Sequence, residues 1–243
     1  MLSNQFFHFL QRHLFLACGL SVLSIHAALT DTSTAATLWH QGLDPSVGTA
    51  VADQEFPDSQ GSSIYVVSDV TFDSAVRIDK ITVPFSDQAG DWPTGAANAI
   101  LNIFPVDTAL DTEDATSGKQ VPVTISPQGT YVAHNITATN LSIELPSGSY
   151  WIGLTPILAG ELYGQEFHLR ATTSVGQLSH VSNPGGRFDH SALWIPGADL
   201  GADFQDAAIT VFGSEIAMVA VPEPSAAFGL LLLQFGFLVR RRR

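Results

Sequence analysis

The sequence contains very little cysteine. Its only cysteine, Cys18, lies in an apolar stretch near the start of the chain. Disulfide bonds, thiolate nucleophiles and cysteine-bound metals are therefore excluded for the rest of the chain. A domain without these stabilising links depends on its hydrophobic core, and a domain of roughly 190 residues is large enough to form one.

Basic residues are also scarce. Residues 28–220 contain 22 acidic residues and only five basic ones, while Arg240–Arg243 end the sequence. A surface this acidic repels phosphate backbones and anionic headgroups, so we expect no nucleic-acid partner. The charge suits an extracellular domain and is compatible with recruitment of divalent cations.

The common catalytic motifs are absent. There is no Gly-x-Ser-x-Gly elbow, no His-Glu-x-x-His and no glycine-rich phosphate loop. Asp189-His190-Ser191 contains the residue types of a hydrolase triad, but adjacent residues in a strand point to opposite faces. We therefore expect no catalytic residues and no enzyme activity, and a cryptic hydrolase is the least favoured alternative. The histidines after residue 27 do not have metal-ligand spacing: His40, His134, His168, His180 and His190.

The first apolar run is too short to span a bilayer comfortably. Residues 14–23 follow the weakly basic Arg12 and precede small residues at Ala27 and Ala28. This order is typical of a secretory signal peptide covering residues 1–27, with cleavage after Ala27. It implies export through the Sec translocon and processing by signal peptidase.

A lipoprotein signal that uses Cys18 is the alternative for this segment. It is disfavoured because Phe15 stands where leucine is usual and the apolar run continues past the cysteine.

The last 23 residues combine three elements. In the first, two prolines flank Glu223, fix the backbone and remove donors, so the segment stays extended and open to an enzyme. In the second, residues 226–239 would form an apolar helix about 21 Å long, short of the roughly 30 Å hydrocarbon core unless the bilayer thins. The third is a basic cluster that anchors the end in the cytoplasm. The motif is Val221, Pro222, Glu223, Pro224 and Ser225, and the cluster is Arg240, Arg241, Arg242 and Arg243.

This order of elements in residues 221–243 resembles the PEP-CTERM sorting signal. The resemblance implies a membrane-embedded exosortase that recognises the motif and cuts near it. It also implies a Gram-negative type of envelope and a link with exopolysaccharide or biofilm matrix. The implied route is transient anchoring in the inner membrane, followed by the cell surface, the outer membrane or the extracellular matrix. A plain tail anchor is the alternative.

Between these ends, the pattern predicts an all-β domain. After a flexible leading segment at 28–36, residues 37–220 show short alternating runs separated by Gly, Pro, Asn and Asp, without a sustained helical period. We predict an antiparallel β-sandwich of jelly-roll type, and the middle of the chain resembles secreted bacterial jelly-roll modules. The expected strands are 62–67, 76–83, 99–104, 121–125, 130–133, 141–145, 150–154, 165–172, 192–195 and 207–212.

Two local features are specific. The apolar phase changes across Asp79-Lys80, which predicts a β-bulge. Residues 141–145 and 150–154 alternate on either side of Pro146-Ser147-Gly148, which predicts a β-hairpin. The polar segments 107–119 and 181–189 are expected to be loops.

Two acidic segments are candidate calcium sites, because calcium prefers grouped oxygen donors. Their spacing fits no EF-hand, so a solvated acidic loop is the alternative in each case. The first group is Asp107, Asp111, Glu113 and Asp114, and the second is Asp199, Asp203 and Asp206.

Trp92 is the candidate sugar-binding residue. It lies in a loop-like Gly90-Asp91-Trp92-Pro93 context, where an exposed ring could stack on a sugar. The alternative is burial in the core, which is the usual place for tryptophan.

Together these features favour an exported, non-enzymatic protein of the cell surface or extracellular matrix. The alternative is a β-sandwich module that binds carbohydrate or calcium. No cofactor is implied other than calcium.

Overall fold

The computed structural model describes residues 35–43, 50–87, 96–107, 109–127, 133–158, 166–172, 176–186, 193–200 and 204–217. All of them belong to one compact unit that begins at Ala35. The predicted signal peptide with its cleavage at Ala27, the sorting signal and Trp92 lie outside the described residues.

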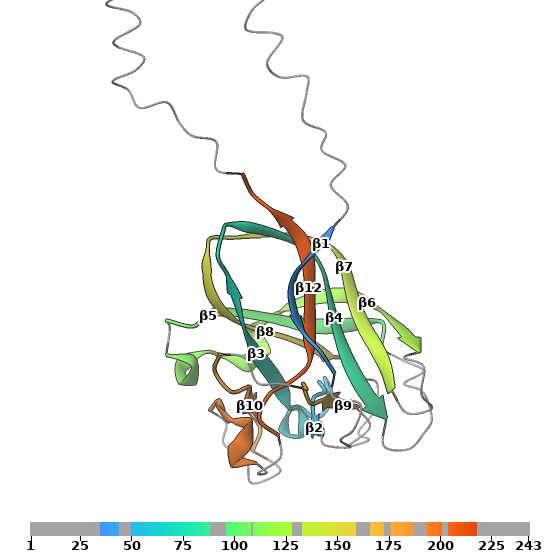
Figure 1. Cartoon of the computed structure of the whole chain (residues 1–243). Helices are drawn as coiled ribbons and strands as arrows, with labels where there is room; N and C mark the ends of the chain where they lie inside the picture. Colours follow the sequence, from blue (N-terminus) through green and yellow to red (C-terminus); the bar gives the residue numbers. More distant parts are fainter. Residues whose placement is uncertain are drawn as a thin grey trace, which may run out of the picture. The chain divides into compact units, whose positions relative to one another are not determined.

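Twelve strands make up the described part of the chain (Figure 1). The strands pair antiparallel, and no α-helix occurs among the described residues, so the prediction of an all-β antiparallel domain is confirmed. The strands are β1 (Ala36–Gln41), β2 (Ala50–Ala52), β3 (Tyr65–Phe72), β4 (Val76–Asp87), β5 (Asn98–Pro105), β6 (Lys119–Pro127), β7 (Ala133–Leu145), β8 (Gly148–Pro156), β9 (Glu166–Leu169), β10 (His180–Ser182), β11 (Ile195–Pro196) and β12 (Ile209–Glu215). Short 3-10 turns are η1 (Gln60–Ser62), η2 (Leu110–Thr112), η3 (Ala115–Ser117) and η4 (Gly197–Asp199).

The strands form one curled antiparallel sheet, a half-barrel. Its order is β1-β12-β4-β7-β6-β5-β8-β3-β10-β11, and β9 pairs with β4 and β2. Strand β6 forms the corner, because Lys119–Pro122 pair with β5 whereas Val123–Pro127 pair with β7. We call β1, β12, β4 and β7 the β4 half, and β5, β8, β3, β10 and β11 the β8 half.

One apolar core is shared by the two halves. Side chains alternate along each strand, so every second residue points into the same space. Ile81 and Ile136 from the β4 half and Ile152 and Leu154 from the β8 half are 0–1% exposed in this core. Burying each such side chain stabilises the fold by about 1.5–3 kcal/mol.

A second apolar cluster covers the opposite face of the β8 half. Trp151 alternates with Tyr150 and Ile152, which belong to the shared core, and packs instead with Phe104 and Trp194. The indole Nε1 of Trp194 donates to the Glu113 carbonyl oxygen at 3.0 Å. The predicted loop 107–119 is therefore held against this face, and it contains the turns η2 and η3.

The predicted bulge is confirmed. Against β12, Lys80 pairs with Phe212 and Ile78 with the next residue, Gly213, which leaves Asp79 as the extra residue in β4. Against β7 the register also shifts between Ile78 and Lys80, but there residues 140–142 of β7 lie opposite Asp79. This shift lets Ile78 and Ile81 both reach the shared core although they differ in phase.

The predicted hairpin is wrong. Strand β7 pairs with β4 and β6, whereas β8 pairs with β3 and β5, so Pro146-Ser147 connects the two halves of the sheet. The connection from Phe72 to Val76 crosses in the same way beside it, because β3 pairs with β8 and β4 with β7. Alternation shows which face of the sheet a residue lies on, but it does not show which strands are neighbours. A hairpin and a connection that crosses between the two halves therefore have the same sequence pattern.

Several strand limits also differ from the prediction. Val181 and Ser182, expected in a loop, belong to β10, and the short strand β2 was not predicted. Strand β7 runs from Ala133 to Leu145 without a break, although Asn140 and Ser142 have left-handed φ values of 57° and 51°. The sequence pattern predicted two strands here, 130–133 and 141–145, and left residues 134–140 between them unassigned.

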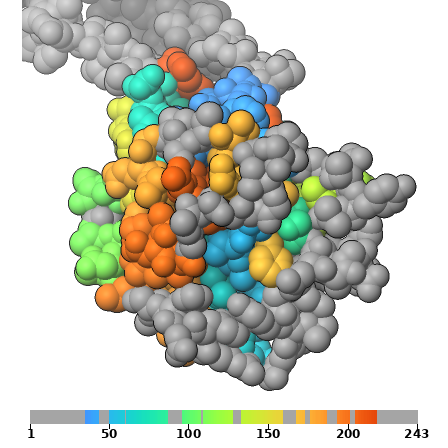
Figure 2. Space-filling view, turned by 60° about the horizontal axis from the view of Figure 1, so that its bottom comes forward, coloured from blue at the N-terminus to red at the C-terminus, as the bar shows by residue number. Residues whose placement is uncertain are grey.

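The described chain enters and leaves the sheet at the same end. Strand β1 pairs with β12, with Ala36 opposite Gly213, and Figure 1 shows both strands reaching this end. The other end contains β2, β9, β10 and η4, and Figure 2 shows its blue and orange surfaces side by side. Ala52, Val181 and Phe204 pack together there.

Ile81→Ala is expected to lower the free energy of unfolding by about 2–5 kcal/mol, because the cavity lies in a core that both halves share. Ile81→Val is the matched control and is expected to cost about 0.5–1.5 kcal/mol. Denaturant unfolding followed by the fluorescence of the buried Trp151 and Trp194 measures both. Equal midpoints for wild type and Ile81→Ala would contradict a single shared core.

Candidate functional site

A buried acid–histidine pair lies between β9 and the main sheet. The Nδ1 atom of His168 is 3.0 Å from Asp53 Oδ2, and Thr155 Oγ1 donates to Asp53 Oδ1 at 2.6 Å. His168 Nε2 is 2.9 Å from the Ala208 carbonyl oxygen, and the Phe85 ring packs against the imidazole at 5.1 Å. Asp53, Thr155 and His168 are at most 1% exposed.

This pair has no free reactive atom. A carbonyl oxygen can only accept a hydrogen bond, so His168 Nε2, which faces the Ala208 carbonyl oxygen, carries a proton. The other ring nitrogen, Nδ1, is hydrogen-bonded to the Asp53 carboxylate. Burial raises the pKa of Asp53, an effect that the hydrogen bond from His168 opposes. The pair joins β9 to β8 through Thr155 and to the start of β12 through Ala208, which is a structural role.

The predicted second calcium group is not brought together. Asp206 is 1% exposed and accepts from Ser179 Oγ at 2.6 Å and from Gln41 Nε2, whereas Asp199 is exposed. Asp203 lies outside the described residues. Asp206 therefore belongs to a buried polar network rather than to an acidic surface loop.

The first calcium group does not converge either. Asp114 caps η3, because its Oδ1 accepts from Thr116 N at 2.9 Å and from Thr116 Oγ1 at 2.7 Å. Asp107 instead lies near Tyr150, whose pKa is raised by burial and then by the charge of Asp107. Within the described ranges, no three His, Cys, Asp or Glu side chains gather closely enough to hold a metal ion. The geometry gives no support to a preformed calcium site here.

Asp69 is a buried carboxylate with one unused oxygen. Its Oδ2 accepts from Gln177 N at 2.7 Å, and its Oδ1 has no hydrogen-bond partner among the described residues. Gly176 has φ 80° and packs against the Asp69 carboxylate, and a Cβ atom at Gly176 would collide with Asp69 Oδ2. Burial raises the pKa of Asp69, while the donor Gln177 N lowers it.

The outer face of the β4 half and the adjoining part of β6 contain a line of four threonine hydroxyls that ends at a histidine. Register places residues of β1, β12, β4, β7 and β6 opposite one another in succession. Paired residues share a face of the sheet, and this face is opposite to the shared core. We call the set the hydroxyl row: His40, Thr210, Thr82, Thr137 and Thr124.

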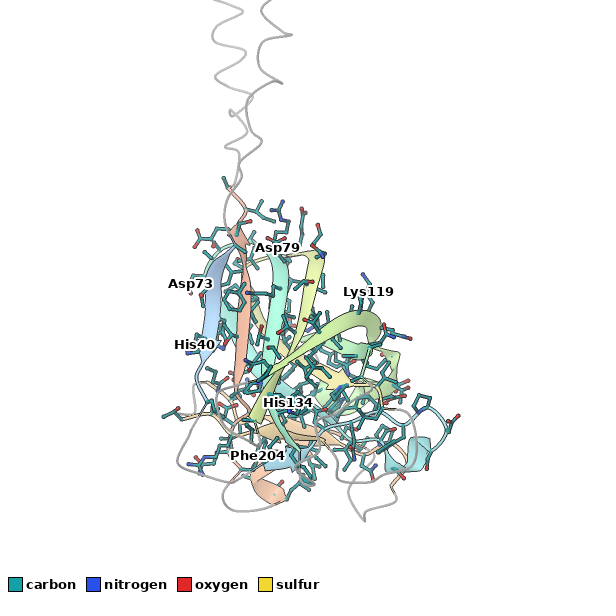
Figure 3. The ribbon with its side chains drawn as sticks, turned by 90° about the vertical axis from the view of Figure 1, so that its right-hand side faces the viewer. His40, Asp73, Asp79, Lys119, His134 and Phe204 are labelled. Carbon is teal, nitrogen blue, oxygen red and sulfur yellow. The ribbon has the colours of Figure 1, made fainter. Side chains whose placement is uncertain are left out.

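The row is connected across the strands. His40 Nδ1 lies 2.9 Å from Thr210 Oγ1, and the hydroxyls of Thr82 and Thr137 lie 3.2 Å apart. Thr124 Oγ1 is 3.5 Å from the Thr137 carbonyl oxygen. Neighbouring strands are about 4.8 Å apart, so the row extends about 19 Å at right angles to the strands. In Figure 3, His40 in β1 and Lys119 at the start of β6 lie on opposite sides of the view.

The residues around the row include no acidic residue and one basic residue, Lys80. The next row consists of Thr37, Phe212, Lys80 and Thr139, and on the other side lie Pro84, Asn135 and Ser126. The Lys80 ammonium stands 3.6 Å from the centroid of the Phe212 ring, a cation–π contact that fixes it on this face. None of these residues is acidic, although the domain as a whole is strongly acidic.

A shallow groove of about 370 Å³ adjoins the row at the corner of the sheet. It opens where β6 leaves β7, since the pairing of these strands ends at Ala138, and the left-handed Asn140 follows in β7. Non-glycine residues held in that conformation cost about 1–3 kcal/mol and often mark functional surfaces. The groove is lined by Lys119, Gln120, Val121, Pro122, Val123, Thr124, Thr139, Asn140 and Leu141.

The sequence pattern did not reveal this face. Thr137 and Thr139 alternate within one strand, but Thr82, Thr124 and Thr210 come from three other strands. Only the register aligns them. The bulge at Asp79, which the sequence does predict, helps to set the register between β4 and β12, whereas the register between β4 and β7 depends on residues 140–142 opposite Asp79.

No protein-family model, curated protein or solved structure matches this chain. In the part of the chain that the structure describes, no helix is long and apolar enough to cross a membrane.

Asp53→Ala is expected to lower the free energy of unfolding by about 3–5 kcal/mol, because it leaves His168 buried without its carboxylate. Thr155→Val removes one hydrogen bond to the same carboxylate and is expected to cost about 1–3 kcal/mol. Denaturant unfolding compares the variants. If Asp53→Ala cost no more than Thr155→Val, the pair would not be a structural link.

Asp69→Asn is expected to stabilise the fold more at pH 7 than at pH 4. The raised pKa of Asp69 means that the folded state binds a proton more tightly than the unfolded state. The protonated Asp69 carboxyl group therefore contributes to stability below its ordinary pKa of 3.8, and this contribution is lost as the pH rises through the pKa of Asp69 in the folded state. The measurement is the difference in unfolding free energy between variant and wild type at both pH values. A difference that does not grow with pH would contradict this assignment.

Proposed function

We propose that the protein is an exported, non-enzymatic component of the cell surface or extracellular matrix, sorted by an exosortase-type membrane enzyme. The observation that carries this proposal is the order of elements at residues 221–243. A proline-flanked Glu223, a short apolar stretch and Arg240–Arg243 follow one another without a gap. The motif gives an enzyme an extended target, and the two following elements hold it at the membrane.

The position of the domain ends supports this proposal. Ala36 lies opposite Gly213, so the segments before β1 and after β12 are joined to the same end of the sheet. If the domain is held by its C-terminal segment, the end of the sheet opposite to that attachment is open to the surroundings, and so are the outer faces of the sheet. Release of the leader after Ala27 would leave a chain attached through the tail alone.

We also infer that the curled sheet is a β-sandwich of jelly-roll type. Two halves of the sheet share one core, which is the arrangement of a sandwich. The connections between β3 and β4 and between β7 and β8 cross from one half to the other, as connections in two-layer β folds do.

Carbohydrate binding is the second candidate function. It is favoured by the hydroxyl row and the adjoining groove, which offer donors and acceptors and contain no acidic residue themselves. The partner that this proposal implies is the exopolysaccharide of the matrix. Trp92 stays a predicted sugar platform, and calcium stays a predicted ligand.

Deleting residues 222–243 is expected to move the protein from the membrane fraction to the soluble fraction. The deletion removes the extended motif, the apolar stretch and the basic cluster together. Fractionation of cells that produce tagged full-length and truncated chains measures this change, in hosts with and without an exosortase.

The matched control replaces Pro222 and Pro224 by alanine and leaves the apolar stretch and the arginines intact. This variant is expected to stay with the membrane and to escape exosortase-dependent cleavage. A truncated chain that still sediments with membranes would overturn the proposed sorting.

A further inference from the structure

We propose that the hydroxyl row is the docking surface for an acidic polysaccharide, whose chain lies across β1, β12, β4, β7 and β6 and passes Lys80 and the groove that Lys119 lines. This inference rests on the proposed function, because it names the face and the ligand class through which the surface protein contacts its matrix. It adds a site made of residues other than those of the tail and Trp92.

The geometry of the row suits an extended, hydroxyl-rich polymer. Five side chains from five strands form one line of about 19 Å, and a threonine hydroxyl both donates and accepts hydrogen bonds. A polysaccharide repeats the same hydroxyl and ring-oxygen groups along its length, so successive rings can meet successive strands. Thr124 is exposed, and it belongs both to the row and to the groove, which continues the line toward Lys119.

Charge selects an acidic ligand for this face. The sequence contains only two lysines, and Lys80 and Lys119 both border the row or its groove. Residues 28–220 contain 22 acidic residues, yet none occurs in the row, in its neighbouring rows or in the groove lining. The acidic residues nearest to Lys80 face Arg77: Asp79 Oδ1 lies 3.1 Å from Arg77 Nε, and Glu144 pairs with Arg77 in the register. A polyanion is therefore repelled by the acidic surface elsewhere and attracted here. Lys80 stays on this face because its ammonium rests on the Phe212 ring.

The arrangement also favours polysaccharide over a peptide strand. The hydroxyl row runs at right angles to the strands and is made of side chains, whereas an added peptide strand would pair with a backbone edge parallel to the strands. A second copy of this chain would bring a domain of like charge against the face, which the net charge of −13 disfavours.

The test uses the full-length chain in nonionic detergent and measures its retardation in native gels that contain alginate, a polymer of uronic acids. Neutral dextran of similar length serves as the comparison polymer. The expected result for the wild-type chain is retardation by alginate with an apparent affinity at least tenfold higher than for dextran. Equal retardation by both polymers would overturn the acidic specificity, and no retardation by alginate would overturn the proposal.

The double variant Thr82→Val, Thr137→Val removes two hydroxyls and keeps the shape and the β propensity. It is expected to bind alginate at least tenfold more weakly. Lys80→Gln with Lys119→Gln is expected to weaken alginate binding and leave dextran unchanged. Thr71→Val is the matched control, because Thr71 is an exposed threonine on the outer face of the β8 half whose hydroxyl lies 2.7 Å from Ser149 Oγ. It is expected to bind like the wild type.

Thermal melting of each variant checks the fold. If the folded double valine variant bound alginate as the wild type does, or changed the oligomeric state instead, the hydroxyl row would not be the polysaccharide site. The proposed function is tested separately by membrane fractionation of the same variants. All of them should sort as the wild type does, whereas the chain that lacks residues 222–243 should not.

Discussion

The apolar core that the two halves of the curled sheet share is the constraint on which the rest of the structure depends. The chain has no cysteine after Cys18, so burial of residues such as Ile81, Ile136 and Leu154 must hold the halves together. Packing on the inner face sets the register of β4 against β7 and β12. That register then decides which polar residues line up on the outer face, including the hydroxyl row.

The sequence predicts the class of the fold, but it does not predict which strands pair with one another. Alternation and turn residues identify an all-β domain, and the change of phase at Asp79 identifies the bulge. The same alternation cannot tell whether Leu145 and Tyr150 belong to neighbouring strands or to opposite halves, because it reports only faces. The structure separates them, and this crossing makes β7 a partner of β4 and β6.

The candidate sites show the same limit. Two groups of acidic residues in the sequence predicted calcium sites. In the structure Asp114 caps the turn η3, and Asp206 is buried and hydrogen-bonded to Gln41 and Ser179. The threonines of the hydroxyl row are far apart in the sequence and gave no signal. The tail is different, because its elements are contiguous and their order can be interpreted without a fold. This is why destination could be proposed from the sequence and the ligand-binding face could not.

The most direct test of the account is the intact mass of the protein recovered from the surface or matrix of a producing cell that contains an exosortase. Export and sorting predict a chain that begins at Ala28 and ends within or close to Val221–Ser225, without the four arginines. Recovery of a chain that still ends at Arg243 would contradict the central claim that residues 221–243 are a signal to be recognised and cut.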